Sequence, residues 1–256
     1  MKRSRPWLGL SFLLACLLVW QILVTVRVLD ARTIPSPWTV IAAFADKQQL
    51  AALGRQAVAS LERLALGFGL AAVLAIPLGI LIGQHQRLFR VLQPGLEMLR
   101  AIPAVILIPL AMLYLGMGTP MKVAVIAYGA FFPIVINTIY GVRNVETKFV
   151  LTARTFGYDR GEIFRFVLLP STLPWIFSGM RIALSLGLVV TVAAEMVGTI
   201  DGLGYLILYG LRTFKVTQVF TGIVTLGFLG WSLNKLFLFV QSRLIPWHPD
   251  FRKEGR

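Results

Sequence analysis

The sequence predicts an all-α integral membrane protein with about six spanning helices. The chain is 57% hydrophobic and its mean hydropathy is +0.78, whereas soluble domains are only about half apolar. Its apolar residues also gather in runs close to the roughly 20 residues that a helix needs to cross a bilayer. Helices pair their own backbone groups, so they are the structures expected where water is excluded.

The net charge of +14 does not indicate a nucleic-acid partner. The basic residues lie in short gaps between apolar runs rather than on one water-facing surface, so we expect the lipid bilayer as the surrounding partner and no nucleic acid. Cys16 is the only cysteine, which excludes an internal disulfide and a cysteine-based metal site. We expect no bound metal.

Six segments are expected to span the membrane, and the third is expected to be short, kinked by Pro103 and Pro109, and buried among its neighbours. The spans are residues 7–28, 61–83, 101–115, 121–140, 176–200 and 219–240. Before the second span, Pro35 and Pro37 predict a turn, followed by a helix along the membrane interface. We therefore divide the chain into an N-terminal span with an interfacial segment (1–54), a membrane core (55–245) and a cytoplasmic tail (246–256).

Orientation follows from the lysines and arginines in the connecting segments, which concentrate on the cytoplasmic side. With the N-terminus inside, sixteen of them fall in inner segments and eight in outer ones, with Lys235 inside a span. Both termini are therefore expected in the cytoplasm, together with residues 141–175.

Within that cytoplasmic stretch, the spacing of Val145, Phe149, Ala153 and Phe156 places them on one side of a helix. Gly157 is suited to end that helix in the left-handed conformation.

A second short helix is expected over residues 160–168. Asp159 and Glu162 have the spacing of a capping box at its start. Pro170 and Pro174 are expected to break it before the fifth span. The pair would be held at the membrane face by phenylalanines, namely Phe149, Phe156, Phe164 and Phe166.

The polar face of this bent pair would be available to a partner. Its residues are Arg154, Thr155, Tyr158, Asp159 and Arg160. From the residues alone, a second interpretation is equally open: a connecting loop whose arginines only satisfy the orientation rule.

The stretch LTARTFGYDRGEIFRFVLLP (151–170) resembles the cytoplasmic loop of bacterial ATP-binding-cassette (ABC) importer permeases, with its pattern E-A-A-x3-G-x9-I-x-L-P. Ala153, Gly157, Val167 and the pair Leu169–Pro170 match that pattern, whereas Leu151 and Thr152 replace its glutamate and first alanine. Four further stretches are similar to permeases of the sulfonate, taurine and nitrate branch. They are LEMLRAIPAVILIPLAMLYLGMG, AYGAFFPIVINTIYG, LPWIFSGMRIAL and AAEMVGTIDGLGYLI, and the likeness covers about residues 55–245.

The resemblance implies a type I importer permease in the bacterial cytoplasmic (inner) membrane. Two copies would form a path for a small solute such as a sulfonate, taurine or nitrate, and a periplasmic binding protein would deliver it. Two separate ATPase subunits would dock on the bent helices and would bind the ATP and magnesium. The docking residues would be Ala153, Arg154, Thr155, Gly157, Tyr158, Asp159, Arg160 and Pro170. The chain itself contains no G-x-x-x-x-G-K-[ST] motif, so we expect it to bind no cofactor and to be no enzyme.

Glu195 is expected inside the fifth span, where an isolated carboxylate is costly. Arg63 lies at a similar depth in the second span, so an ion pair between the two is the favoured interpretation. In the alternative, Glu195 lines the transport path.

Gly202 and Gly204 predict a turn before a short helix near the periplasmic mouth, a candidate contact for the binding protein.

Two other functions remain open. A self-sufficient ion-coupled carrier would need an internal repeat and several intramembrane ionisable residues, and a membrane scaffold would make the loop pattern accidental. Gly79 and Gly83 fit a small-xxx-small packing pattern, although glycines are common in membrane helices.

Overall fold

The computed structural model describes residues 6–30, 33–197 and 199–247, and it contains no strand in these ranges. The helices, in chain order, are α1 (Pro6–Thr25), α2 (Pro37–Ala43), α3 (Lys47–Gln84), α4 (Gln86–Arg100), η1 (Ala104–Leu107), α5 (Ile108–Leu115), α6 (Thr119–Arg143), α7 (Thr147–Thr155), α8 (Arg160–Ile163), η2 (Phe164–Leu168), α9 (Leu169–Glu195), α10 (Leu203–Arg212) and α11 (Val216–Leu244). The predicted all-α class is confirmed.

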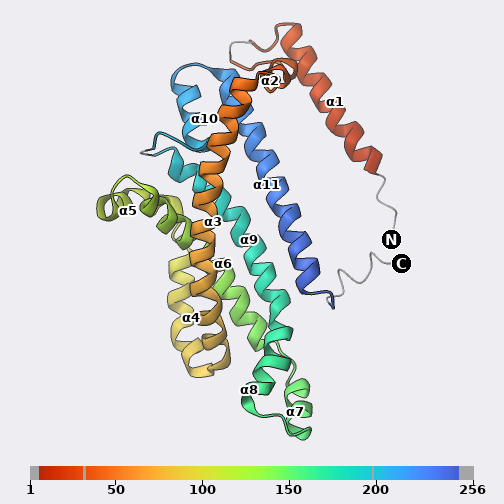
Figure 1. Ribbon diagram of the computed structural model, residues 1–256, viewed down its shortest axis with the longest axis vertical. Coiled ribbons are helices and arrows are strands. Elements are labelled where there is room, and N and C mark those ends of the chain that lie inside the picture. Colours follow the sequence, from red (N-terminus) through yellow and green to blue (C-terminus); the bar gives the residue numbers. More distant parts are fainter. Residues whose placement is uncertain (1–5, 31–32, 198, 248–256) are drawn as a thin grey trace.

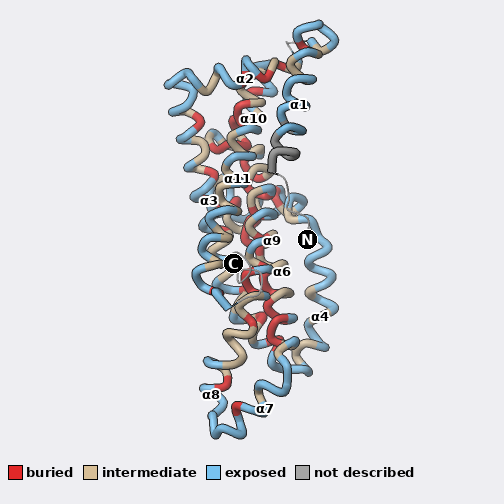
Figure 2. Tube along the Cα trace, turned by 90° about the vertical axis from the view of Figure 1, so that its right-hand side faces the viewer, coloured by how far each residue is buried: buried red, intermediate tan, exposed pale blue. Residues whose placement is uncertain are grey.

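The core of the molecule lies where α3, α6 and α9 pack together (Figure 1). Figure 2 shows the buried residues gathered along the middle of this bundle. Small side chains dominate the contact, among them Ala71, Ala75, Ala130 and Ala183, each at most 1% exposed. Small residues let membrane helices approach closely, and the resulting packing holds helices together where no hydrophobic effect does.

One face of α3 carries a small residue at every fourth position. The stripe consists of Gly67, Ala71, Ala75, Gly79 and Gly83, all of them buried. A Cβ added at Gly79 would lie 2.7 Å from Cβ of Thr138 on α6, and one at Gly83 would lie 2.6 Å from Cβ of Val142. Gly79 and Gly83 therefore do serve close helix packing.

The third expected span, residues 101–115, consists of η1 and α5 and forms a bent pair with α4, which precedes it. α4 meets the segment Ala104–Leu115 at an angle of 79°, and Pro103 stands at the junction as the N-cap of η1. The expected kink is present at Pro103 but not at Pro109, which lies in the first turn of α5. The expected burial of this span within the chain is wrong, since Leu113 and Tyr114 of α5 are largely exposed. Residues 86–100, expected as a loop, form α4 because their apolar residues follow the helical period.

The segment before the second span differs from the expected interfacial helix. Pro37 does begin a short helix, α2, capped by the Ser36 hydroxyl. A new helix then starts at Lys47 and continues unbroken to Gln84, so the expected boundary at residue 54 falls inside α3. The tail from residue 248 onward lies outside the described residues.

Four helices are long and apolar enough to cross a membrane within the described part of the chain, or five if the bent pair of α4 and Ala104–Leu115 counts as one span. The described apolar part of α1, Leu14–Thr25, is shorter. α2 and α10 lie at one end of the molecule, and α7 and α8 lie at the other (Figures 1 and 2).

Candidate functional site

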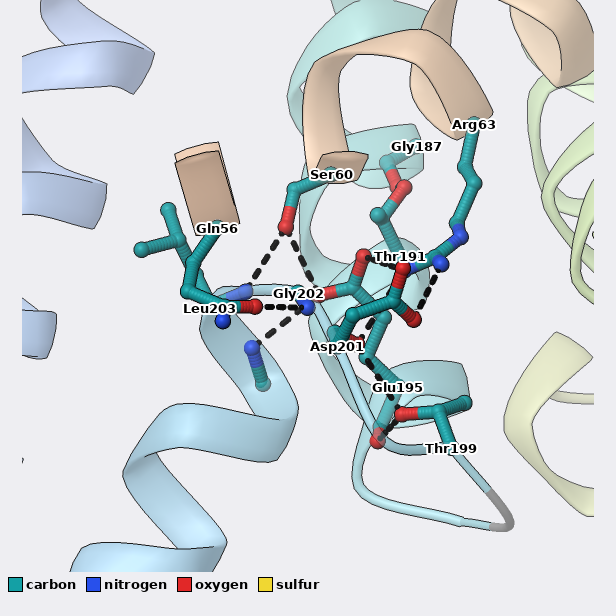
Figure 3. Close-up of polar contacts among 11 residues, drawn as sticks. Gln56, Ser60, Arg63, Gly187, Thr191, Glu195, Thr199, Asp201, Gly202 and Leu203 are labelled. Atoms are coloured by element: carbon teal, nitrogen blue, oxygen red, sulfur yellow. Dashed lines mark hydrogen bonds and ion pairs between the residues drawn. The ribbon is translucent and has the colours of Figure 1, made fainter. Parts of the chain in front are cut away.

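A cluster of charged side chains lies at the end of the bundle that carries α10 (Figure 3). Arg63 of α3 donates from Nη1 to Oε1 of Glu195 at 2.8 Å and from Nη2 to Oδ1 of Asp201 at 2.5 Å. The side chains of Arg63 and Glu195 are 7% and 0% exposed, whereas that of Asp201 is 48% exposed. One guanidinium therefore links a fully buried carboxylate to one that reaches the surface.

The second oxygen of Glu195 is also occupied. Oε2 accepts from the hydroxyl of Ser60 at 2.8 Å and from the backbone N–H of Gly204 at 3.0 Å. Ser60 in turn accepts from the N–H of Leu203 at 2.9 Å, and Gln56 accepts from the N–H of Gly202. The start of α10 is thereby bound to α3 and to the end of α9, and its first backbone N–H groups are satisfied.

The two predicted glycines allow this close approach. Gly202 has φ of +102°, a conformation reserved for glycine, and an added Cβ would lie 2.3 Å from the carboxyl carbon of Glu195. An added Cβ at Gly204 would lie 2.3 Å from the carbonyl oxygen of Val192. Gly202 forms the turn, whereas Gly204 lies in the first turn of α10, and both are buried.

The Arg63–Glu195 pair was predicted from the sequence, whereas the contacts made by Gln56, Ser60 and Asp201 were not. The fifth span was expected to reach residue 200, whereas α9 ends at Glu195, because the chain turns back there and caps the carboxylate. Gln56, Ser60 and Arg63 follow one another at spacings of four and three, so they share one helix face. That spacing was the available signal for a polar site on α3.

A cavity of about 820 Å³ adjoins the cluster. It is lined on one side by Arg63 and Asp201, and on others by Lys122 and Arg212. Glu195 is absent from its described lining. Of the two interpretations of Glu195, this geometry favours the structural ion pair.

The opposite end of the molecule carries the bent pair α7–α8. Gly157 ends α7 with φ of +83°; its N–H donates to the carbonyl of Arg154, and that of Tyr158 to the carbonyl of Ala153. Asp159 and Glu162 form the capping box that starts α8, with distances of 2.7 and 2.8 Å. These hydrogen bonds fix the angle between the two helices.

Three of the four phenylalanines expected to hold this pair at the membrane face are exposed, Phe164 is half-buried, and their contact with the membrane stays a prediction. Phe156 is 78% exposed, and Phe149 and Phe166 are about half exposed. The buried contacts are made instead by Ala153 and Ile163. The polar face predicted for a partner is exposed over its full length, at Arg154, Thr155, Tyr158, Asp159 and Arg160.

The expected break at Pro170 and Pro174 is wrong. Residues Arg160–Glu195 form one continuous helix of 36 residues, in which Phe164–Leu168 is a π-helical turn. The wider turn, with the Leu169 N–H donating to the carbonyl of Phe164, accommodates the proline that follows. The Thr172 hydroxyl donates to the carbonyl of Leu168 at 2.7 Å, so the helix continues.

Residues 75–247 match the family described as binding-protein-dependent transport system inner membrane component. The chain belongs to this family. It is thus a membrane-spanning permease of the ABC importers, located in the inner membrane, and the family is not itself catalytic.

Relatives of the permease have names that agree with the branch indicated by the sequence. The putative aliphatic sulfonates transport permease SsuC of Bacillus subtilis (strain 168) is 32% identical over 98% of this chain and 91% of its own length. The nitrate import permease NrtB of Leptolyngbya laminosa is 37% identical over 75% and 68%. The taurine transport permease TauC of Escherichia coli (strain K12) is 29% identical over 95% and 90%.

A solved structure supports the fold of the permease. An inward-facing form of the MetNI methionine ABC transporter superposes with a TM-score of 0.66 at 22% identity, covering 78% of this chain and 98% of the other. At this identity the likeness concerns the fold alone.

Within the described residues, no group of three or more His, Cys, Asp or Glu side chains could hold a metal ion.

Proposed function

We propose that two copies of this permease form the path for a small anion, of the sulfonate, taurine or nitrate kind. Two separate ATPase subunits dock on α7–α8 and bind the ATP and magnesium, and a periplasmic binding protein delivers the solute at the α10 end. Family membership and the names of the relatives support the proposal.

The feature that carries the coupling role is the geometry of α7–α8. A loop that merely connected two spans would need neither a capping box nor a glycine-closed helix end, yet both are present here. The pair also lies at the extreme end of the molecule with an exposed polar face (Figure 1). Rigidity and exposure together suit a part that fits into a groove of another subunit.

The same end offers further positive charge. A cavity of about 620 Å³ beside α8 is lined by Arg143, Arg154 and Arg160. Neither Arg154 nor Arg160 pairs with an acid among the described residues. An acidic rim on the ATPase groove would complement these side chains.

A second copy of the permease would cover the apolar side of α5, in the bent pair that α4 forms with η1 and α5. Leu110, Leu113 and Tyr114 of α5 are exposed there. A cavity of about 470 Å³ is lined by Ala104 of η1, by Tyr128 and other residues of α6, and by residues of α9. Pairing of two such surfaces would enclose a path between the copies.

The α10 end provides the surface for a binding protein. Since Gly202 and Gly204 are buried, the contact would fall on exposed neighbours such as Leu211 and Phe214. A cavity of about 1,010 Å³ between the start of α3 and the link from α10 to α11 lies next to Phe214.

The proposal is tested by replacing Gly157 in the permease co-expressed with its ATPase. Valine at φ +83° costs about 1–2 kcal/mol, so ATPase binding should weaken about 5- to 30-fold. The measurements are copurification of the ATPase and ATP-driven uptake into proteoliposomes.

The matched control is Gly157→Asn, because asparagine tolerates the left-handed region. It should copurify the ATPase and transport nearly as well as the original chain. Full coupled uptake by a correctly inserted Gly157→Val permease, or failure of the unaltered chain to retain any ATPase, would overturn the proposed function.

A further inference from the structure

Lys122 is a buried lysine whose ammonium has no partner in the described structure. It lies in the first turn of α6 and is only 3% exposed. It forms neither a hydrogen bond nor an ion pair with any described residue, yet it lines the cavity of about 820 Å³. The stem of Lys122 is buried and its charge faces this cavity, where a group of opposite charge could meet it.

The nearby acids are already engaged. Lys122 lies within the electrostatic reach of Glu195 and Asp201, but Arg63 makes the direct contacts with both carboxylates. The second oxygen of Glu195 is taken by Ser60 and Gly204. Arg63 alone therefore accounts for the structural pairing, and Lys122 remains available to the cavity.

The rest of the cavity wall favours an anion. Arg63, Lys122 and Arg212 line it beside Asp201, and because Arg63 is paired with Asp201 and Glu195, Lys122 and Arg212 are the cations left to meet an anion. Gly118, Thr119 and Lys122 place the N-terminus of α6 on the same wall, and the Gly118 N-cap provides no side-chain hydrogen bond to the first N–H groups. Pro120 has no N–H, but the N–H groups on either side of it and the helix dipole attract negative charge.

Another part of the wall is apolar. Met117, Met196, Ile200 and Leu208 line it, next to the stacked rings of Tyr205 and Tyr209. A cationic corner beside an apolar wall suits a molecule with an oxyanion head and a short organic tail.

We propose that this cavity is a binding site for a small organic oxyanion, of the alkanesulfonate kind, with Lys122 contacting the head group. The inference rests on the proposed function and adds to it a residue and a place on the permease itself. The anion would meet this site at the α10 end, before it passes between the spans.

The probe is trifluoromethanesulfonate, titrated into the purified full-length permease and followed by its fluorine NMR line width. Binding should saturate and should be displaced by propanesulfonate more readily than by nitrate, because nitrate has no tail. Lys122→Gln should weaken binding about tenfold or more, since it removes a charge-assisted contact. Lys122→Arg should retain binding.

Lys47→Gln is the matched control, since Lys47 is exposed and begins α3. It removes the same charge without touching the cavity and should bind the probe as the original chain does. Equal weakening in both variants would reveal general attraction to a basic chain and would overturn the site.

Thermal unfolding separates binding from a structural role. A ligand that binds only the folded state raises the unfolding temperature, so propanesulfonate should stabilise the original chain and not Lys122→Gln. Without anion, Lys122→Gln should be no less stable, because the lysine has no partner to lose. A lower unfolding temperature for Lys122→Gln in the absence of anion would show a structural lysine and would overturn the inference.

The two proposals fail separately. Probe binding that depends on Lys122, in a permease that supports no ATP-driven uptake, would retain the site and remove the proposed function. ATP-driven uptake together with probe binding that ignores Lys122 would do the reverse.

Discussion

Arg63 has the central position in the buried cluster, because it alone contacts both carboxylates. Removing it would leave Glu195 charged, fully buried and dependent on one hydroxyl and one N–H. Removing the charge of Glu195 would still leave Arg63 paired with Asp201. The two halves of this ion pair are therefore unequal.

We predict that Arg63→Gln lowers the free energy of unfolding by about 3–5 kcal/mol, the usual effect of stripping one partner from a buried pair. Glu195→Gln should lower it by about 1–3 kcal/mol, since it leaves a mismatched hydrogen bond to the Gly204 N–H. The double change should cost less than the sum of the single changes, because the two residues interact directly. Thermal unfolding in detergent measures all three.

Glu62→Gln is the control for this series, because Glu62 is the exposed neighbour of Arg63 on α3. It should leave the unfolding temperature unchanged. Equal losses from Arg63→Gln and Glu195→Gln would contradict the unequal pairing described here.

Among single residues, those that the sequence marks as functional are charged residues within apolar runs. This pattern identified Arg63 and Glu195, whose burial demands a partner. Asp201 and Lys122 were missed because both lie at the ends of apolar segments, where a charge normally meets water. The burial of Lys122 and the contact of Asp201 with Arg63 depend on how α3, α6 and the end of α9 pack together, which no local pattern reports.

Among the elements, α3 and α6 depend on close contact along the small-residue stripe. Gly79→Ala would place a Cβ within 2.7 Å of Thr138, so the helices would have to separate. We predict a loss of about 1–3 kcal/mol in the free energy of unfolding, as for other overpacked positions.

Gly69→Ala is the matched control on the same helix, because nothing lies within 4 Å of its added Cβ. It should be neutral or stabilising by up to about 1 kcal/mol, since alanine is the better helix former. If Gly79→Ala were as stable as Gly69→Ala, the close packing of α3 against α6 would be refuted.

Element positions followed the apolar runs, but element ends did not. Helix α3 begins at Lys47, well before the apolar run, because a polar helix can continue when it packs on α10. The prolines near residue 170 were taken as breakers, and the π-helical turn that absorbs them has no clear sequence signal. Hydropathy therefore predicted which segments of the chain lie in the membrane, whereas the residues at which each helix begins and ends depend on tertiary contacts.

For the whole molecule, orientation in the membrane is a prediction from the distribution of lysine and arginine. In a Cys16→Ser background, a cysteine at Phe214 should react with an impermeant maleimide in spheroplasts, whereas one at Thr155 should react only in inverted vesicles. Both positions are exposed, so accessibility depends on the side of the membrane. Labelling of Thr155→Cys from outside would reverse the orientation and exclude ATPase docking at α7–α8.

The unbroken helix from Arg160 to Glu195 joins the two ends of the permease mechanically. Its 36 residues extend about 54 Å, so a tilt of about 5° would displace one end relative to the other by about 5 Å. Helix α9 ends at Glu195, which binds Arg63 and the start of α10. Such a tilt would therefore move the cluster at the α10 end of the molecule. A nucleotide-driven shift at one membrane surface would thus reach the opposite surface through a single rod, without a relay of side chains.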